Sequence, residues 1–139
     1  MAIRQFNGAD VDAVVELWEA CGLTRSWNDP RKDIARKLDV QPELFLVMEQ
    51  DARVAGTAMV GFDGHRGWVN YLAVHPDFRS RGFGRELMQR AEALLLGLGC
   101  PKINLQVRAG NEAVLGFYRN LGYAEDPVAS MGKRLIPDS

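Results

Sequence analysis

The run from Tyr71 to Arg90 constrains the fold of this chain more than any other part of the sequence. It begins as an apolar, strand-like segment, passes through a turn that contains Gly82 and Gly84, and continues as a helix. A further strand-like segment follows at Lys102–Val107. Two strands joined through a helix in this way lie parallel in one sheet. The sequence therefore predicts an α/β fold around a parallel pair of strands.

The glycine-containing turn is also a candidate anion site. Glycines let the backbone approach a ligand closely, and the N-terminus of a helix carries about half a positive charge. Three arginines stand beside it, Arg79, Arg81 and Arg85. Guanidinium groups form charge-assisted, often bidentate hydrogen bonds with phosphate oxygens. The turn therefore predicts binding of a nucleotide-like ligand with a pyrophosphate.

The composition limits the class of protein. The chain has 139 residues, of which 47% are hydrophobic, enough for one core, and we expect one domain over residues 1–139. The net charge is −1, so no overall basic field exists for nucleic acid or an anionic membrane surface. No apolar run approaches the roughly 20 residues that span a bilayer, and no signal-peptide core is present. We expect a cytoplasmic protein without nucleic-acid or membrane partners.

The cysteines and other potential metal ligands point to no metal site. Cys21 and Cys100 are far apart in the sequence and fit neither a CxxC pair nor a disulfide scaffold. No set of His, Cys or carboxylate residues has metal-ligand spacing, so no metal is expected. The oligomeric state is left open between a monomer and a homodimer.

Hydrophobic periodicity and turn residues predict the remaining elements. The first helix is expected from Val11, with Asp10 as its cap and Gly22 at its end, and the second starts at Asn28–Pro30. Two more helices are predicted from Gly82 and over Asn111–Asn120. Strands are expected at Ile3–Phe6, Leu44–Val47, Val54–Val60, Trp68–Val74 and Lys102–Val107, with one or two closing strands within Tyr123–Leu135. The hairpins before the crossover are antiparallel, so the sheet is expected to be mixed.

Two motifs, in order, resemble the GNAT family of acetyl-CoA-dependent N-acetyltransferases. The family's acyl-CoA loop has the form Arg/Gln-x-x-Gly-x-Gly/Ala after a Val-x-Pro element, as here at Arg79, Gly82 and Gly84 after Val74–Pro76. A later Asn, Phe-Tyr and Gly-Tyr match the family at Asn111, Phe117–Tyr118 and Gly122–Tyr123. The phrases Trp27–Pro30 and Asp63–Gly67 resemble the small bacterial YpeA-type members.

The resemblance implies a fold and a set of cofactor contacts. The fold is a mixed, mostly antiparallel sheet of six or seven strands with about four helices and a central splayed pair of parallel strands. Acetyl-CoA is the implied acyl donor, although the sequence leaves a longer acyl group open. The residues implied to bind it are Leu72, Ala73, Val74, Arg79, Ser80, Arg81, Gly82, Phe83, Gly84, Arg85, Asn111 and Tyr118.

Two groups are implied to take part in catalysis. By resemblance, the hydroxyl of Tyr118 faces the CoA sulfur, and the N–H of Leu72 stabilises the oxyanion formed when an amine attacks. An aromatic residue on the core face of a helix is the alternative interpretation of Tyr118. The acceptor is expected to lie near the first two helices, and Trp27, Asn28 and Asn70 are the candidate acceptor-binding residues.

The chain departs from many family members in one respect. They carry a Glu on the strand before the acyl-CoA loop that deprotonates the acceptor amine through water, but Trp68–Val74 holds no carboxylate. We therefore expect either an acceptor amine of low pKa or a base recruited from Asp63, His65 or Glu112.

Two other classes of protein remain as alternatives. A non-catalytic acyl-CoA sensor would keep the loop at Arg79–Gly84 without using Tyr118. A dinucleotide-binding domain is disfavoured because no Gly-x-Gly-x-x-Gly turn follows the first strand. The sequence favours an enzyme that transfers acetyl to a primary amine in a ternary complex.

Overall fold

Five strands form one mixed sheet in the computed structural model, which describes residues 1–139. They are β1 (Ala2–Gln5), β2 (Phe45–Gln50), β3 (Arg53–Phe62), β4 (Gly67–Val74) and β5 (Ile103–Asn104), and they lie in that order across the sheet. The first three pairings are antiparallel and β4–β5 is parallel. The mixed sheet and its crossover through a helix are confirmed.

The number of strands differs from the expected six or seven. The segment Tyr123–Leu135 contains no strand, and β5 is shorter than the predicted Lys102–Val107. Pro127 removes a ladder donor, and apolar side chains such as Val128 (78% exposed) and Met131 (92%) bury almost no surface. Little free energy is therefore gained by ordering this segment as a strand.

The chain divides into two compact units, Met1–Leu105 with Asp138–Ser139, and Gln106–Pro137. The first contains the sheet and three helices, α1 (Val11–Ala20), α2 (Pro30–Leu38) and α3 (Phe83–Gly97). The second contains α4 (Glu112–Asn120). All four helices were predicted from the sequence, and none is long and apolar enough to cross a membrane.

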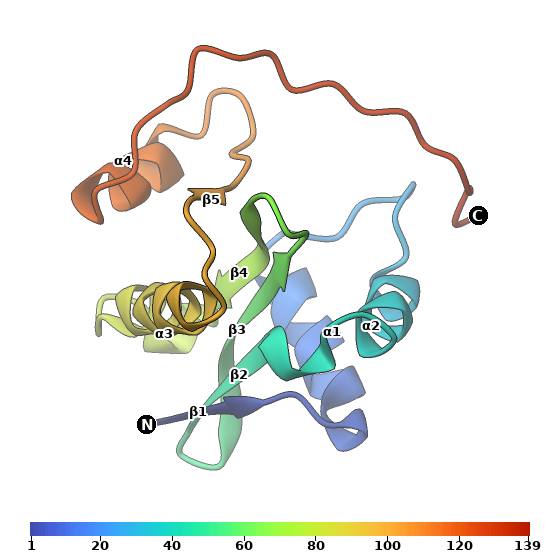
Figure 1. The fold of residues 1–139 in the computed structure, drawn as a ribbon. Helices are drawn as coiled ribbons and strands as arrows, with labels where there is room; N and C mark the ends of the chain where they lie inside the picture. Colours follow the sequence, from blue (N-terminus) through green and yellow to red (C-terminus); the bar gives the residue numbers. More distant parts are fainter. The chain divides into compact units, whose positions relative to one another are not determined.

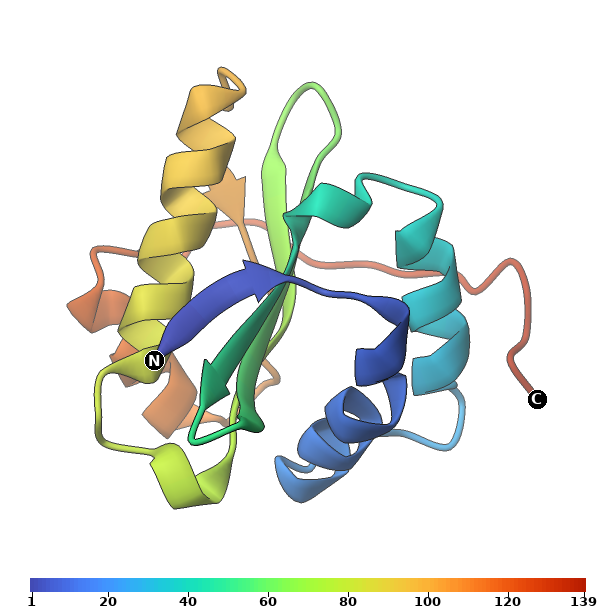
Figure 2. The ribbon, with the colours of Figure 1, turned by 90° about the horizontal axis from the view of Figure 1, so that it is seen from below.

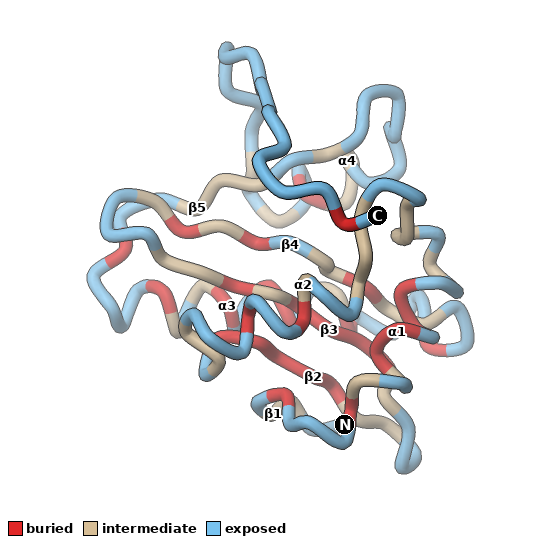
Figure 3. The backbone as a smooth tube through the Cα atoms, turned by 90° about the vertical axis from the view of Figure 1, so that its right-hand side faces the viewer, coloured by how far each residue is buried: buried red, intermediate tan, exposed pale blue.

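Two layers of helices enclose the sheet of the first unit. Helices α1 and α2 pack against each other on one face, and α3 contacts β3 and β4 from the other face (Figures 1 and 2). Buried residues follow β2 and β3 through the middle of this unit (Figure 3). The core under α1 includes Phe6, Trp18 and Phe45. The ring of Phe45 stacks on those of both Phe6 and Trp18.

Local side-chain contacts explain where the N-terminal helices begin. Asp29 accepts a hydrogen bond from the Arg31 N–H and caps α2, in which Pro30 occupies the first position. Asp10 occupies the predicted N-cap position of α1, but its side chain makes no capping bond to that helix. Its carboxylate instead accepts two hydrogen bonds from Arg4, and Asn7 caps the short 3₁₀ turn that leads into α1.

Candidate active site

The glycine turn leads into a helix that no side chain caps. Gly82 has φ +78° and occupies the N-cap position of α3, and Ser80 has φ +63°. A Cβ built on Gly82 would meet no atom within 4 Å, so the space in front of the turn is open. The first N–H groups of a helix have no partner within the helix. They are consequently available to an anion at Phe83, Gly84 and Arg85.

The arginines around this turn are held in different ways. The Nε of Arg79 donates to the Val74 carbonyl over 3.1 Å. The guanidinium of Arg81 lies 5.4 Å from the centre of the Phe78 ring, and that of Arg53, which the sequence analysis missed, lies 4.9 Å from the same ring. Arg53 also pairs with Asp77 at 3.1 Å. The turn therefore has a local concentration of positive charge, to which the exposed Arg85 adds.

The β4 strand has an edge that β5 leaves largely unpaired. The parallel ladder joins only Gly67 and Trp68 to β5. Farther along, the N–H of His75 donates to the Ala55 carbonyl, so the neighbouring Gly56–Val74 pair is of the non-hydrogen-bonded type. The backbone groups of Val74 consequently point away from β3.

The two backbone groups of Val74 differ in their availability. Its carbonyl accepts hydrogen bonds from Arg79 and from the Cys21 thiol. Ala73, by contrast, pairs with Thr57 of β3. Leu72, Ala73 and Val74 are the predicted cofactor-binding residues on this strand. Of these, Val74 directs its N–H toward the unpaired edge.

A β-bulge interrupts β4 at Tyr71 and Leu72. Thr57 pairs with Ala73 and Met59 pairs with Asn70, so two residues of β4 stand opposite one residue of β3. Tyr71 adopts φ +50°, a left-handed conformation that is unusual for a non-glycine residue. Bulges of this kind redirect backbone groups and are frequent beside active sites.

The side chain of Tyr71 joins the bulge to α1 and α2. Its ring stacks on Trp18 with centroids 3.7 Å apart. Its hydroxyl donates to Asp33 Oδ2 over 2.7 Å and accepts from Asn28 Nδ2 over 2.9 Å. Burial and, second, the Asp33 carboxylate raise the pKa of Tyr71, which keeps the phenol neutral.

The three predicted acceptor-binding residues have different surroundings. Asn28 belongs to the cluster with Tyr71 and Asp33. Trp27 beside it is 55% exposed, and Asn70 is exposed on β4 immediately before the bulge. The structure therefore brings Asn28 to the bulge that follows Asn70.

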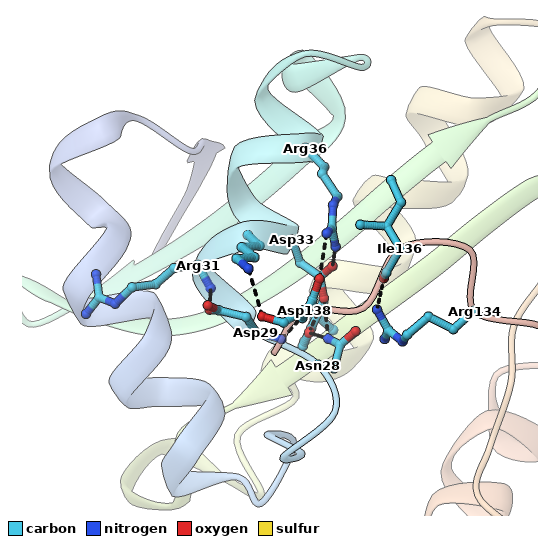
Figure 4. A network of polar contacts seen from close by, with 10 residues as sticks. Asn28, Asp29, Arg31, Asp33, Arg36, Arg134, Ile136 and Asp138 are labelled. Carbon is cyan, nitrogen blue, oxygen red and sulfur yellow. Dashed lines mark hydrogen bonds and ion pairs between the residues drawn. The ribbon is translucent and has the colours of Figure 1, made fainter.

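The start of α2 is held by a buried carboxylate, as Figure 4 shows. Asp138 accepts hydrogen bonds from the Asp29 N–H at 2.7 Å and from Arg36 at 2.6 Å, and its side chain is only 1% exposed. Its carbonyl accepts from the Lys32 Nζ at 2.7 Å. Arg36 also pairs with Asp33, so the contacts of Asp138 reach the carboxylate that holds Tyr71.

The second unit contains the predicted catalytic tyrosine. Tyr118 is 8% exposed on α4 and lies edge-on to the rings of Phe117 and Tyr123. Burial raises the pKa of Tyr118 to about 12. The predicted cofactor residue Asn111 accepts a hydrogen bond from the Val114 N–H and thereby caps α4.

The surroundings of the three candidate bases, Asp63, His65 and Glu112, do not favour deprotonation of an acceptor amine. The Asp63 carboxylate accepts hydrogen bonds from the N–H groups of Arg66 and His65, and these contacts lower its pKa. His65 lies exposed in the same turn. Glu112 is exposed on the first turn of α4 and lies 3.8 Å from Arg119.

Comparisons with known proteins identify the family and the fold. The sequence pattern described as "Acetyltransferase (GNAT) family" matches residues 11–123, and the chain belongs to this family. An acetyltransferase of Yersinia enterocolitica is 51% identical over 99% of this chain and 98% of its own length. An acetyltransferase of Sodalis glossinidius is 52% identical over 99% of this chain and 98% of its own length.

Solved structures of acetyltransferases have the same fold. A putative acetyltransferase from Agrobacterium tumefaciens has a TM-score of 0.79 and 19% identity, and the match covers 96% of this chain and 100% of that one. The ribosomal-protein-S18-alanine N-acetyltransferase of Escherichia coli has a TM-score of 0.75 and 24% identity, over 90% and 78% of the two chains. The protein is therefore an acetyltransferase, as the motifs predicted.

Proposed function

We propose that this acetyltransferase transfers the acetyl group of acetyl-CoA to a primary amine by direct attack in a ternary complex. The observation that carries the proposal is the uncapped N-terminus of α3 behind Gly82, which follows the largely unpaired edge of β4 after the 3₁₀ turn Pro76–Phe78. The family match over residues 11–123 extends from the first compact unit into the second, which supports a single catalytic domain.

The chain offers suitable partners for each part of an acyl-CoA. The N–H groups at the start of α3 are proposed to bind the pyrophosphate, with added positive charge from the side chains of Arg79, Arg81 and Arg85. The backbone of Leu72 and Val74 is proposed to pair with the pantetheine as an added strand does. A solved structure of a related fold, an aminoglycoside acetyltransferase, contains a bisubstrate analogue built on CoA.

Acetyl-CoA supplies an activated thioester when it is bound. The N–H of Leu72 is the proposed donor to the oxygen that becomes negative as the amine attacks. Tyr118 is the proposed donor to the departing sulfur. With a pKa of about 12, its full ionisation by a thiolate of ordinary pKa would be uphill by about 5 kcal/mol. Tyr118 therefore acts by a hydrogen bond to the departing sulfur, the proton lost by the attacking amine ends on that sulfur, and no covalent enzyme intermediate is required.

The acceptor is proposed to bind beside the β4 bulge, where Asn28 contacts Tyr71 and where Trp27 and Asn70 are exposed. None of these groups is a strong base. We therefore propose an acceptor amine of low pKa, which is partly neutral near pH 7.

Two measurements test the proposal on the unaltered protein. Calorimetry with CoA should detect binding, and acetyl-CoA should lose its thioester when members of a library of primary amines are added. Binding without turnover on any amine would favour an acyl-CoA sensor. Absence of CoA binding would contradict the proposal as a whole.

A further inference from the structure

One hydrogen bond fixes the peptide group between Tyr71 and Leu72. The hydroxyl of Thr57 donates to the Tyr71 carbonyl over 2.8 Å. The chain contains no cis peptide, and in a planar trans peptide the C=O and N–H point in opposite directions. The N–H of Leu72 is therefore directed away from the Thr57 side chain.

The direction of this hydroxyl is itself determined by Trp18. The indole Nε1–H of Trp18 lies 2.9 Å from the Thr57 oxygen, and an indole N–H can only donate. The Thr57 oxygen must therefore accept from Trp18, which leaves the hydroxyl hydrogen for the Tyr71 carbonyl. Both side chains are fully buried, so water does not compete for the bond between them.

The packing around Trp18 keeps the donor in place. Its ring stacks on Tyr71, with centroids 3.7 Å apart, and on Phe45, with centroids 6.2 Å apart. Tyr71 thus contacts the relay twice, through its ring on Trp18 and through its carbonyl on Thr57. These contacts hold Tyr71 in a left-handed conformation that L residues rarely adopt.

The geometry points to Thr57 and Trp18 as positioning residues for acetyl transfer. Their hydrogen-bond relay fixes the plane of the Tyr71–Leu72 peptide and so fixes the direction of the Leu72 N–H. This inference rests on the proposed function, in which that N–H stabilises the oxyanion. Neither positioning side chain has to contact a substrate, because each acts through the backbone.

The substitution Thr57→Val tests the relay, since it keeps the branched shape and removes the hydroxyl. Loss of an oxyanion donor typically costs about a hundredfold in kcat, and a donor that is only misdirected should cost about tenfold or more. The affinity for CoA, which has no acyl carbonyl, should change much less. Thr57→Ser restores the hydroxyl and should recover most of kcat, whereas a residue needed only for packing would gain nothing from this change.

A second readout does not depend on turnover. A ketone analogue of acetyl-CoA keeps the carbonyl oxygen and cannot transfer its acyl group. In the unaltered protein, the amide proton of Leu72 should move downfield in NMR spectra with this analogue and much less with CoA. In Thr57→Val the difference between the two ligands should shrink. If Thr57→Val does not fold, Trp18→Phe, which keeps an aromatic ring and removes the N–H that orients the Thr57 hydroxyl, replaces it in both experiments.

The outcomes separate this inference from the proposed function. Absence of CoA binding and acetyl transfer in the unaltered protein would contradict the proposed function. With both present, an undiminished kcat in Thr57→Val overturns the positioning role. So does a Leu72 amide that responds equally to CoA and to the ketone analogue.

Discussion

The hydroxyl of Tyr71 donates to Asp33 Oδ2 over 2.7 Å, although 38 residues separate them in the sequence. This bond joins the bulge of β4 to the first turns of α2. Asn28 donates to the same carboxylate, so three polar side chains meet where the strand is irregular. Their arrangement makes α2 part of the acceptor side of the proposed site.

We expect Tyr71→Phe to weaken acceptor binding. The variant keeps the ring on Trp18 but leaves Asn28 and Asp33 without the hydroxyl, at a cost of about 1–2 kcal/mol in the free energy of unfolding. The KM for the acceptor amine should rise several-fold, while the KM for acetyl-CoA should change little. Steady-state kinetics with each substrate varied in turn checks this, and an unchanged acceptor KM would remove the cluster from acceptor binding.

Tyr118→Phe should lower kcat by about a hundredfold, the usual contribution of a positioned hydrogen-bond donor to developing negative charge, and leave the affinity for CoA nearly intact. Turnover and calorimetry on the same preparation check both parts. Equal kcat for the two proteins would favour the interpretation of Tyr118 as a core aromatic residue only.

The raised pKa of Tyr118 also has a consequence for alkaline stability. Burial holds the folded pKa at about 12, above the ordinary value near 10. The contribution of this group is therefore complete below pH 10 and is lost as the pH rises from 10 toward 12. Unfolding measured across this interval should show less alkaline loss in Tyr118→Phe than in the unaltered protein.

Arg81→Ala should weaken CoA binding by roughly tenfold at low ionic strength, because a charge-assisted contact to phosphate is removed. At about 1 M salt the Debye length falls to roughly 3 Å, so the difference from the unaltered protein should shrink. Arg66→Ala is the matched control. Arg53, beside the turn at Gly82, begins β3, whereas Arg66 lies after the other end of that strand. Equal losses in both variants would indicate a general charge effect.

The parts of the site that are formed by residues close together in the chain could be predicted from the sequence. The turn at Gly82 was recognisable because glycine, arginine and a helix start follow one another in the chain. The relay from Trp18 to Thr57 was not, because its two residues are 39 positions apart and are ordinary core residues by pattern. The left-handed Tyr71 was equally hidden, since no local rule favours that conformation for tyrosine.

The prediction of closing strands within Tyr123–Leu135 was wrong for a related reason. Val128 and Leu135 are apolar residues of this segment, but a strand requires a partner and a buried face, and both side chains are exposed. A single sequence does not supply the partner. The cap of α1 shows the same limit, because Asp10 had the right residue type and position but Arg4 engages its carboxylate.

The ion pair between Arg4 and Asp10 leads to an expectation for acid stability. Arg4 makes two hydrogen bonds of 2.8 Å to the carboxylate and, as the largest cause, lowers its pKa; the N–H of Asn7 acts in the same direction. The stabilisation is present above the unfolded pKa near 4 and is lost as the pH falls through the lower folded value. Asp10→Asn should destabilise the protein by about 1–3 kcal/mol at pH 7. The difference between the two proteins should diminish below pH 4 in chemical denaturation, and a constant difference would contradict this account.

The absence of a carboxylate from β4 leads to an expectation for the acceptor. Near pH 7 an α-amine with a pKa close to 8 is about 10% neutral, whereas a lysine-like amine is below about 0.1% neutral. Asp63 is a poor substitute base, because its backbone contacts lower its pKa. On matched peptides that offer only an α-amine or only an ε-amine, kcat/KM should therefore favour the α-amine by about tenfold or more. Raising the pH from 7 to 8 should increase the rate with the α-amine as its neutral fraction grows. A preference for the ε-amine at pH 7 would require a strong base that accepts the proton in the complex. Asp63→Asn, His65→Gln and Glu112→Gln would then identify it by loss of that preference.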